Sequence, residues 1–138
     1  MRTGPALLDD VTACSLARGE LAFWWLGQHS FIIKLGSTVI YLDPFLSALP
    51  GRLVAPLVQP RQVGQADIVC GSHDHVDHID REAWPVIASA SPRAMFVVPD
   101  LIRESLVRDL KMDPARVLGL DDGKSVTLSG VRITGLPA

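Results

Sequence analysis

Three strand-like runs follow one another closely after residue 20 and restrict the folds open to this chain. The runs are "LAFWWLG", "HSFIIKLG" and "STVIYLDP", which are rich in aromatic and β-branched residues and are separated by Gly27 and Gly36. Connections this short favour an antiparallel meander. Further along, strand-like runs alternate with helical patterns. Together they predict an α/β fold with a mixed β-sheet and helices on one face.

The segments around these runs predict three helices and a long loop. A helix is expected over residues 81–90, with Asp80 as its N-cap, and an amphipathic helix over residues 100–110. A weaker pattern indicates a helix over residues 5–17. Residues 44–65 carry four prolines and no periodic pattern, so we expect a loop there. The runs "RVLGL", "KSVTL" and "VRITGL" predict three closing strands.

Composition excludes several classes of protein. With 138 residues, of which 48% are hydrophobic and 20% charged, the chain can bury the core of one ordinary domain. A net charge of −2 gives no electrostatic case for binding nucleic acid or an anionic membrane. No apolar run approaches the roughly 18 residues of a membrane-spanning helix. Two cysteines make no disulfide framework, so we expect a reducing, cytoplasmic setting.

Three of the four histidines lie in "GSHDHVDHID", residues 71–80, after the apolar strand-like run "ADIVCGS". His73 and His75 are two positions apart, so in extended backbone their side chains project to the same side. Asp77 and His78 follow and add a carboxylate and a third imidazole. These donors suit zinc above all, and also manganese or iron. The stretch predicts a site for one or two divalent ions; the alternative is a set of solvated loop residues.

Within this stretch, "HDHVDH" matches the H-x-H-x-D-H signature of the metallo-β-lactamase superfamily. The wider pattern "AFWWLGQHSFIIKLG", "TVIYLDPFLS" and "SHDHVDHID" resembles the branch that includes L-ascorbate-6-phosphate lactonase. N-acyl-phosphatidylethanolamine phospholipase D is a more distant cousin. The resemblance runs from about residue 20 to the end. It implies that residues 1–138 are the N-terminal half of a hydrolase domain built as a four-layer αββα sandwich.

The resemblance also implies roles for individual residues. His73 and His75 would bind a first metal ion, and Asp77 and His78 a second, with Asp77 also placing the attacking water. Asp43, at the end of its strand-like run, would orient a ligand imidazole by accepting its other N–H. The alternative for Asp43 is a plain turn residue before a proline.

Three polar residues near these positions are expected to stay outside the metal site. Gln28 stands where the phospholipase cousin has a histidine, and we interpret Gln28 and His29 as polar residues at a strand turn. The side chain of Asp74 should point away from its two histidine neighbours.

The function implied is a metal-dependent hydrolase, lactonase-like, in which metal-bound hydroxide attacks the carbonyl of a small-molecule lactone or ester. A phosphodiesterase or phospholipase-like hydrolase is the alternative within the enzymes. The family's second half supplies further ligands, whereas this sequence has no histidine after His78. We therefore expect a truncated chain that is inactive alone, with a C-terminal half or self-association covering the sheet. A non-catalytic metal-binding fragment is the remaining alternative.

Overall fold

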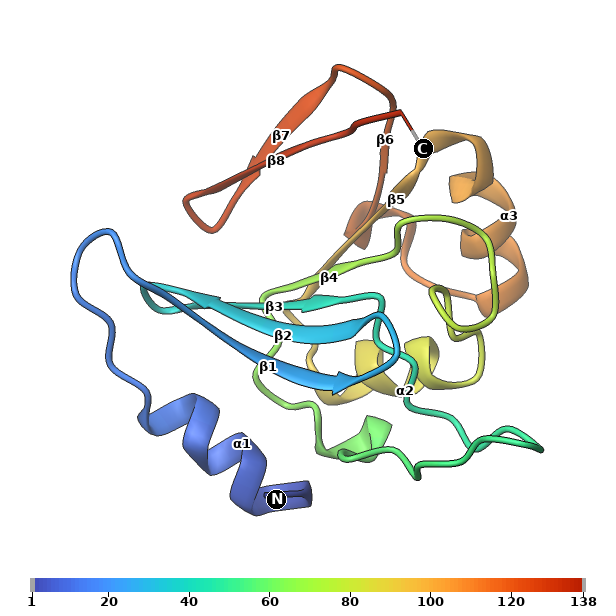
Figure 1. Ribbon diagram of the computed structural model, residues 1–138. Coiled ribbons are helices and arrows are strands. Elements are labelled where there is room, and N and C mark those ends of the chain that lie inside the picture. Colours follow the sequence, from blue (N-terminus) through green and yellow to red (C-terminus); the bar gives the residue numbers. More distant parts are fainter. Residues whose placement is uncertain (1, 138) are drawn as a thin grey trace.

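The computed structural model describes residues 2–137, and its centre is a mixed six-stranded sheet (Figure 1). The strand order is β1-β2-β3-β4-β5-β6. The first three strands form the expected antiparallel meander, and β3 to β6 run parallel. The strands are β1 (Leu21–Gly27), β2 (Ser30–Leu35), β3 (Thr38–Leu42), β4 (Ile68–Cys70), β5 (Met95–Pro99) and β6 (Val117–Leu120). The predicted mixed sheet is confirmed.

The last two strands do not extend the main sheet. β7 (Ser125–Leu128) and β8 (Val131–Thr134) form a separate antiparallel pair. The turn between them contains Ser129 and Gly130, both with positive φ. This conformation matches the twist of a tight hairpin.

The helices are α1 (Gly4–Ala13), α2 (Ala83–Ala90) and α3 (Asp100–Leu110), with short 3-10 turns η1 (Pro60–Gln62) and η2 (Pro114–Arg116). The expectation of a first helix over residues 5–17 was wrong at its end. The helix ends at Ala13 and the chain is extended at Cys14. Nζ of Lys34 donates hydrogen bonds there to Val11 O and Cys14 O, each at 2.7 Å, in place of the backbone N–H groups that would continue the helix.

The second helix begins two residues later than expected. The carboxylate of Asp80 accepts the N–H of Ala83 at 3.0 Å. Asp80 therefore caps the turn that precedes α2, and the helix itself begins at Ala83 and not at residue 81. The same carboxylate accepts the N–H groups of Leu46 and Ser47 at 2.8 and 2.7 Å. These bonds tie Asp80 to the loop after β3, and the two residues that follow Asp80 form a turn before the helix begins.

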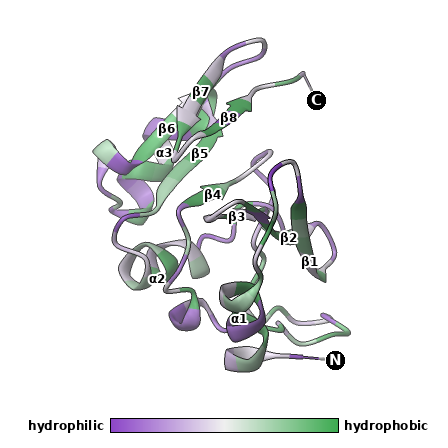
Figure 2. Ribbon diagram, turned by 90° about the vertical axis from the view of Figure 1, so that its left-hand side faces the viewer, coloured by the Kyte–Doolittle hydropathy of each residue, from purple (hydrophilic) through white to green (hydrophobic). Residues whose placement is uncertain are grey.

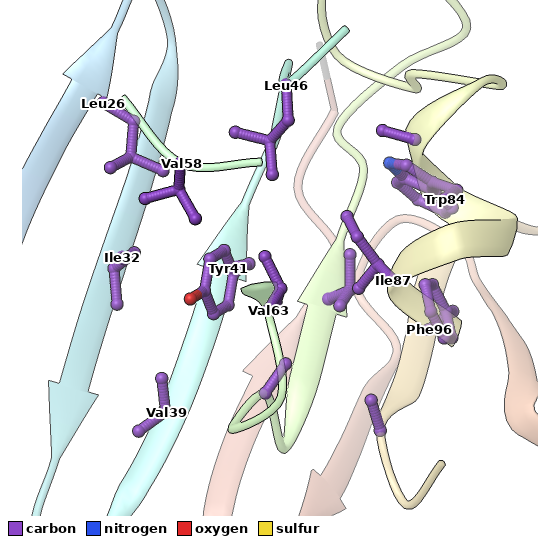
Figure 3. Packing of buried hydrophobic residues seen from close by; sticks show 14 of the residues in the cluster. Leu26, Ile32, Val39, Tyr41, Leu46, Val58, Val63, Trp84, Ile87 and Phe96 are labelled. Carbon is purple, nitrogen blue, oxygen red and sulfur yellow. The ribbon is translucent and has the colours of Figure 1, made fainter. Parts of the chain in front are cut away.

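All three helices contribute to one core on one face of the sheet. Partners across the strands form a continuous apolar row on that face: Trp24, Ile32, Tyr41, Val69, Phe96 and Val117. Figure 3 shows Tyr41 and Ile32 on the side of the sheet where Trp84 and Ile87 of α2 lie. The prediction of helices on one face is confirmed.

The opposite face is apolar and only partly covered. Ile33, Ile40 and Ile68 are partners in one row there, and the β7–β8 hairpin packs against this cluster. The hydroxyl of Thr38 donates to Ser129 O at 2.9 Å and ties the hairpin to β3. Figure 2 shows that β1 and β2 are hydrophobic. Alternate residues of β1 point to this face, and their side chains are exposed: Leu21 58%, Phe23 65% and Trp25 62%.

The strand directions bring several loops to one edge of the sheet. β1 and β3 run in the same direction as β4, so their C-terminal ends lie at the same edge. The turn between β1 and β2, the residue after β3 and the loop after β4 therefore meet there. No helix within residues 2–137 has the length and apolar character needed to cross a membrane.

Candidate metal centre

The loop after β4 folds tightly over the edge of the sheet. Its first residue, Gly71, donates its N–H to Val97 O at 2.9 Å. A Cβ at this position would lie 2.7 Å from Ile79 Cγ1 and 2.9 Å from Trp84 Cη2, so only glycine fits. His75 O accepts the N–H of Ile79 at 2.8 Å, which closes a turn within the loop. This turn directs the histidines of the loop toward one another.

All four histidines of the sequence gather at this edge. The ring centroids of His73 and His75 are 4.5 Å apart, and those of His73 and His78 are 3.9 Å apart. His73 Nε2 lies 3.0 Å from His75 Nδ1. The ring of His29, from the β1–β2 turn, stacks on His78 with centroids 4.9 Å apart.

Asp43 holds His78 from the sheet side. Asp43 directly follows β3, and its side chain is buried. Nδ1 of His78 donates to Asp43 Oδ2 at 2.7 Å, across 35 positions of sequence. This bond occupies Nδ1 and leaves Nε2 of His78 as the nitrogen with a free lone pair. A carboxylate behind an imidazole is the usual arrangement that orients a metal-binding histidine.

Ser72 connects Asp43 to a second histidine. Its N–H donates to Asp43 Oδ1 at 2.7 Å, and its hydroxyl donates to Asp43 Oδ2 at 2.7 Å. Because the hydroxyl proton is used there, Oγ remains an acceptor for Nδ1 of His73, 3.1 Å away. Nε2 of His73 is then left with its lone pair. Ser72 was not singled out in the sequence, although it directly precedes the first histidine of the motif.

The donors at this edge fit a divalent ion. His29, Asp77 and His78 each offer a ligand atom within 4.8 Å of the others. Asp77 Oδ2 lies 3.8 Å from His78 Nε2, the nitrogen that Asp43 leaves free. Two imidazole nitrogens and one carboxylate oxygen are a ligand set suited to zinc, manganese or iron. The His73–His75 pair supplies a second group of nitrogens beside it.

Not every sequence interpretation of this region matches the structure. Asp74 points away as expected, and its carboxylate pairs with Arg81. His29 was interpreted as a simple turn residue, but its ring lies against His78. The signal that could have found it is topological: in an antiparallel meander, the β1–β2 turn and the residue after β3 lie at the same edge.

Cys70, the last residue of β4, is close to the centre without being a ready nucleophile. Burial raises the pKa of its thiol to about 12, and the nearby Asp43 carboxylate adds to the effect. The thiolate, which is the reactive and metal-binding form, is therefore scarce at neutral pH. The chemistry of this edge belongs to imidazoles and carboxylates.

Comparison with known proteins places the chain in a family. The family model described as "Beta-lactamase superfamily domain" matches residues 22–138. An uncharacterised protein of Mycobacterium tuberculosis is 27% identical over 145 residues, covering 97% of this chain and 38% of that protein. A metal-dependent hydrolase of Thermococcus kodakarensis is 31% identical over 116 residues, covering 83% of this chain and 46% of that protein. The chain thus spans less than half the length of these relatives.

Solved structures share the fold at low sequence identity. CmlA, a diiron β-hydroxylase from Streptomyces venezuelae, matches 88% of this chain and 24% of its own with a TM-score of 0.63 and 19% identity. The chemotaxis sensor ODP from T. denticola matches 85% of this chain and 49% of its own with a TM-score of 0.58 and 20% identity. With the family model covering most of the chain, the protein belongs to the metallo-β-lactamase superfamily.

Proposed function

We propose that the edge formed by the β1–β2 turn, Asp43 and residues 71–80 binds one or two divalent metal ions and serves a hydrolase. One observation carries the proposal: all four histidines and Asp77 meet there, and the histidine at the centre, His78, is oriented by a buried carboxylate. The relative from Thermococcus kodakarensis is named a metal-dependent hydrolase, which supports the same class of reaction.

The residues have distinct parts in this proposal. His73 and His75 would hold one ion, and Asp77 and His78 a second, with His29 adjacent to the second group. A divalent ion in such a site supplies Lewis acidity that polarises a carbonyl or phosphoryl oxygen. Zinc is the first choice for this ligand set, with manganese or iron as alternatives.

Asp77 is the proposed catalytic residue among the four. Its carboxylate is partly exposed, so it can reach a water molecule as well as a ligand position. It would orient that water and accept its proton as a carbonyl is attacked. Asp43 and Ser72 act through the histidines: they fix which imidazole nitrogen carries the proton.

The proposed substrate is a small lactone or ester, following the resemblance to the lactonase-like branch. Residues 1–138 by themselves are expected to bind metal without efficient turnover. The described residues bring together few ligands for each ion, and a loosely held ion places the reacting groups poorly.

Metal binding and hydrolysis can be tested in two steps. Isothermal titration of residues 1–138 with Zn²⁺ should show saturable binding that His75→Ala and His78→Ala each weaken at least tenfold, because each removes a ligand nitrogen. Asp74→Ala is the matched control, since this aspartate is in the same loop but pairs with Arg81. Equal affinity of all four proteins for Zn²⁺ would contradict the metal site.

The second step uses the protein at its natural length. Metal-dependent hydrolysis of lactones or carboxylic esters, lost in His78→Ala and kept in Asp74→Ala, is the expected result. Hydrolysis confined to phosphodiesters would retain the centre and overturn the substrate class. Efficient metal-dependent turnover by residues 1–138 as a monomer would show that they need no further ligands.

A further inference from the structure

A cavity of about 550 Å³ lies between the end of β1 and the loop after β3. One wall is the end of β1 and the following turn, residues 25–28, and the other wall is formed by residues 51–54 and Leu57 of the loop after β3. The volume is within the range of about 300–1,000 Å³ that is usual for small-molecule sites. None of these residues is among the proposed metal ligands.

The walls of this cavity are apolar, and several of its side chains are open to solvent. Leu53 is 98% exposed, Val54 59% and Trp25 62%, whereas Leu26 is buried. A leucine, a valine and a tryptophan gathered around one hollow expose apolar surface that gains free energy when it is covered. The hollow therefore favours an apolar occupant.

Arg52 holds the outer wall in shape. Its Nε donates to Val54 O at 2.8 Å, and its Nη1 donates to Phe45 O and Ser47 O, each at 3.0 Å. The guanidinium also lies over the Phe45 ring, 4.5 Å from its centroid. These bonds tie the backbone of residues 52–54 to the rest of the loop, so a ligand need not order this part of the backbone.

The inner wall ends one residue before His29, which contacts the metal centre. Gln28 lines the cavity, and the next residue, His29, stacks on His78. Nε1 of Trp25 donates to Gln28 O at 2.8 Å, which fixes this turn against the cavity wall. A molecule whose reactive group is at the centre can therefore place an attached chain between Trp25 and Leu53.

We propose that this cavity binds the apolar chain of the substrate, an ester or lactone that carries an unbranched alkyl or acyl chain. The inference rests on the proposed function for the identity of the reacting group. It adds a specificity site made by Trp25, Leu53, Val54 and Leu57. The concave shape and its position beside the histidines favour a chain attached to the substrate over a protein partner.

Binding can be measured without metal, which separates this proposal from the hydrolase assignment. Hexanoate, octanoate and decanoate are titrated into the protein at its natural length in EDTA, and the tryptophan emission is followed. We expect a saturable change that is lost in Trp25→Phe, with affinity rising with chain length. Leu53→Asp should weaken decanoate at least tenfold, because a carboxylate would then line the apolar wall.

Leu101→Asp is the matched control, because Leu101 is 94% exposed on α3 and lines no part of this cavity. It should bind decanoate like the parent protein. An absence of saturable decanoate binding, or equal weakening by Leu53→Asp and Leu101→Asp, would overturn the proposal.

A kinetic comparison tests the same site during turnover. The ratio of kcat/KM for a decanoyl ester over a butyryl ester should exceed one and should fall about tenfold in Leu53→Asp but not in Leu101→Asp. Hydrolysis with no dependence on chain length would overturn the specificity site while the hydrolase stands. Decanoate binding that depends on Leu53, without hydrolysis of any ester, would leave the cavity in place and refute the proposed function.

Discussion

Asp43 combines a strained backbone with a dense set of contacts. Its φ of 45° lies in the left-handed region, which is uncommon for residues other than glycine. Its N–H donates to Cys70 O at 2.8 Å, and its carbonyl accepts the hydroxyl of Ser30 at 2.7 Å. Its carboxylate accepts hydrogen bonds from Ser72 and His78. Strain of this kind persists where the surroundings over-determine it, and such positions concentrate at functional sites.

The carboxylate of Asp43 can be tested by an isosteric change. Asp43→Asn replaces one carboxylate oxygen by an NH₂ group, so it cannot accept all the bonds from Ser72 and His78. We expect Zn²⁺ affinity to fall about 10–100-fold, the usual cost of losing a partner behind a metal-binding histidine. Isothermal titration measures the change, and Asp74→Asn is the control in the same region. Unchanged affinity in Asp43→Asn would assign Asp43 to the fold alone.

At the scale of elements, α1 is attached to the sheet by a buried lysine. Lys34 of β2 points into the helix side, and its Nζ donates to the carbonyl oxygens of Val11, Thr12 and Cys14 at 2.7, 3.2 and 2.7 Å. All three of its protons are thereby used. A cation at the C-terminal end of a helix also interacts favourably with the helix dipole. The apolar side chains of α1 then complete the core.

Replacing this lysine should loosen α1. Lys34→Met keeps most of the side-chain volume but leaves three carbonyl oxygens without their donor, so we expect a loss of about 1–3 kcal/mol in the free energy of unfolding. Urea denaturation followed by circular dichroism measures it. Lys124→Met is the control, because Lys124 is exposed and pairs with Asp121. Equal stability of Lys34→Met and the parent chain would mean that water replaces the ammonium at no cost.

For the whole molecule, the uncovered sheet face is the dominant feature. The β7–β8 hairpin lies beside β5 and β6 and away from β1 (Figure 2). The apolar side chains of Leu21, Phe23 and Trp25 on β1 stay exposed. Exposed apolar surface of this extent marks an association surface in soluble proteins. In a preparation of residues 1–138, the available occupant is a second copy of the same face.

Self-association should therefore depend on β1. Sedimentation velocity of residues 1–138 should show larger species as concentration rises, and Phe23→Lys should shift them toward monomer, because it places a charge at the centre of the exposed row. Lys is tolerated at an edge strand, so the fold should be kept. Arg18→Lys is a neutral control outside the strand. A monomer at all concentrations would show that the β7–β8 hairpin suffices to protect this face.

The sequence by itself determined the features that depend on neighbouring residues. Aromatic and β-branched runs separated by glycines predicted the meander, and helical spacing predicted α3 at its observed bounds. The run of histidines and aspartates after an apolar strand predicted a candidate site and its donor types. The resemblance placed Asp43 behind a ligand imidazole, and its carboxylate does lie 2.7 Å from His78 Nδ1, because the two residues follow neighbouring parallel strands.

Only the tertiary structure decided which distant residues meet. Three contacts join segments that are far apart in the sequence and that no periodic pattern connects. They are the stacking of His29 on His78, the hydrogen bonds of Lys34 to α1 and the hydrogen bonds of Asp80 to the loop after β3. The separation of β7 and β8 from the main sheet was also decided by the tertiary structure, because a strand-like run in the sequence does not show which strand it pairs with. Periodicity along a chain reports which face of an element is apolar, whereas strand order and side-chain contacts are set by packing between elements.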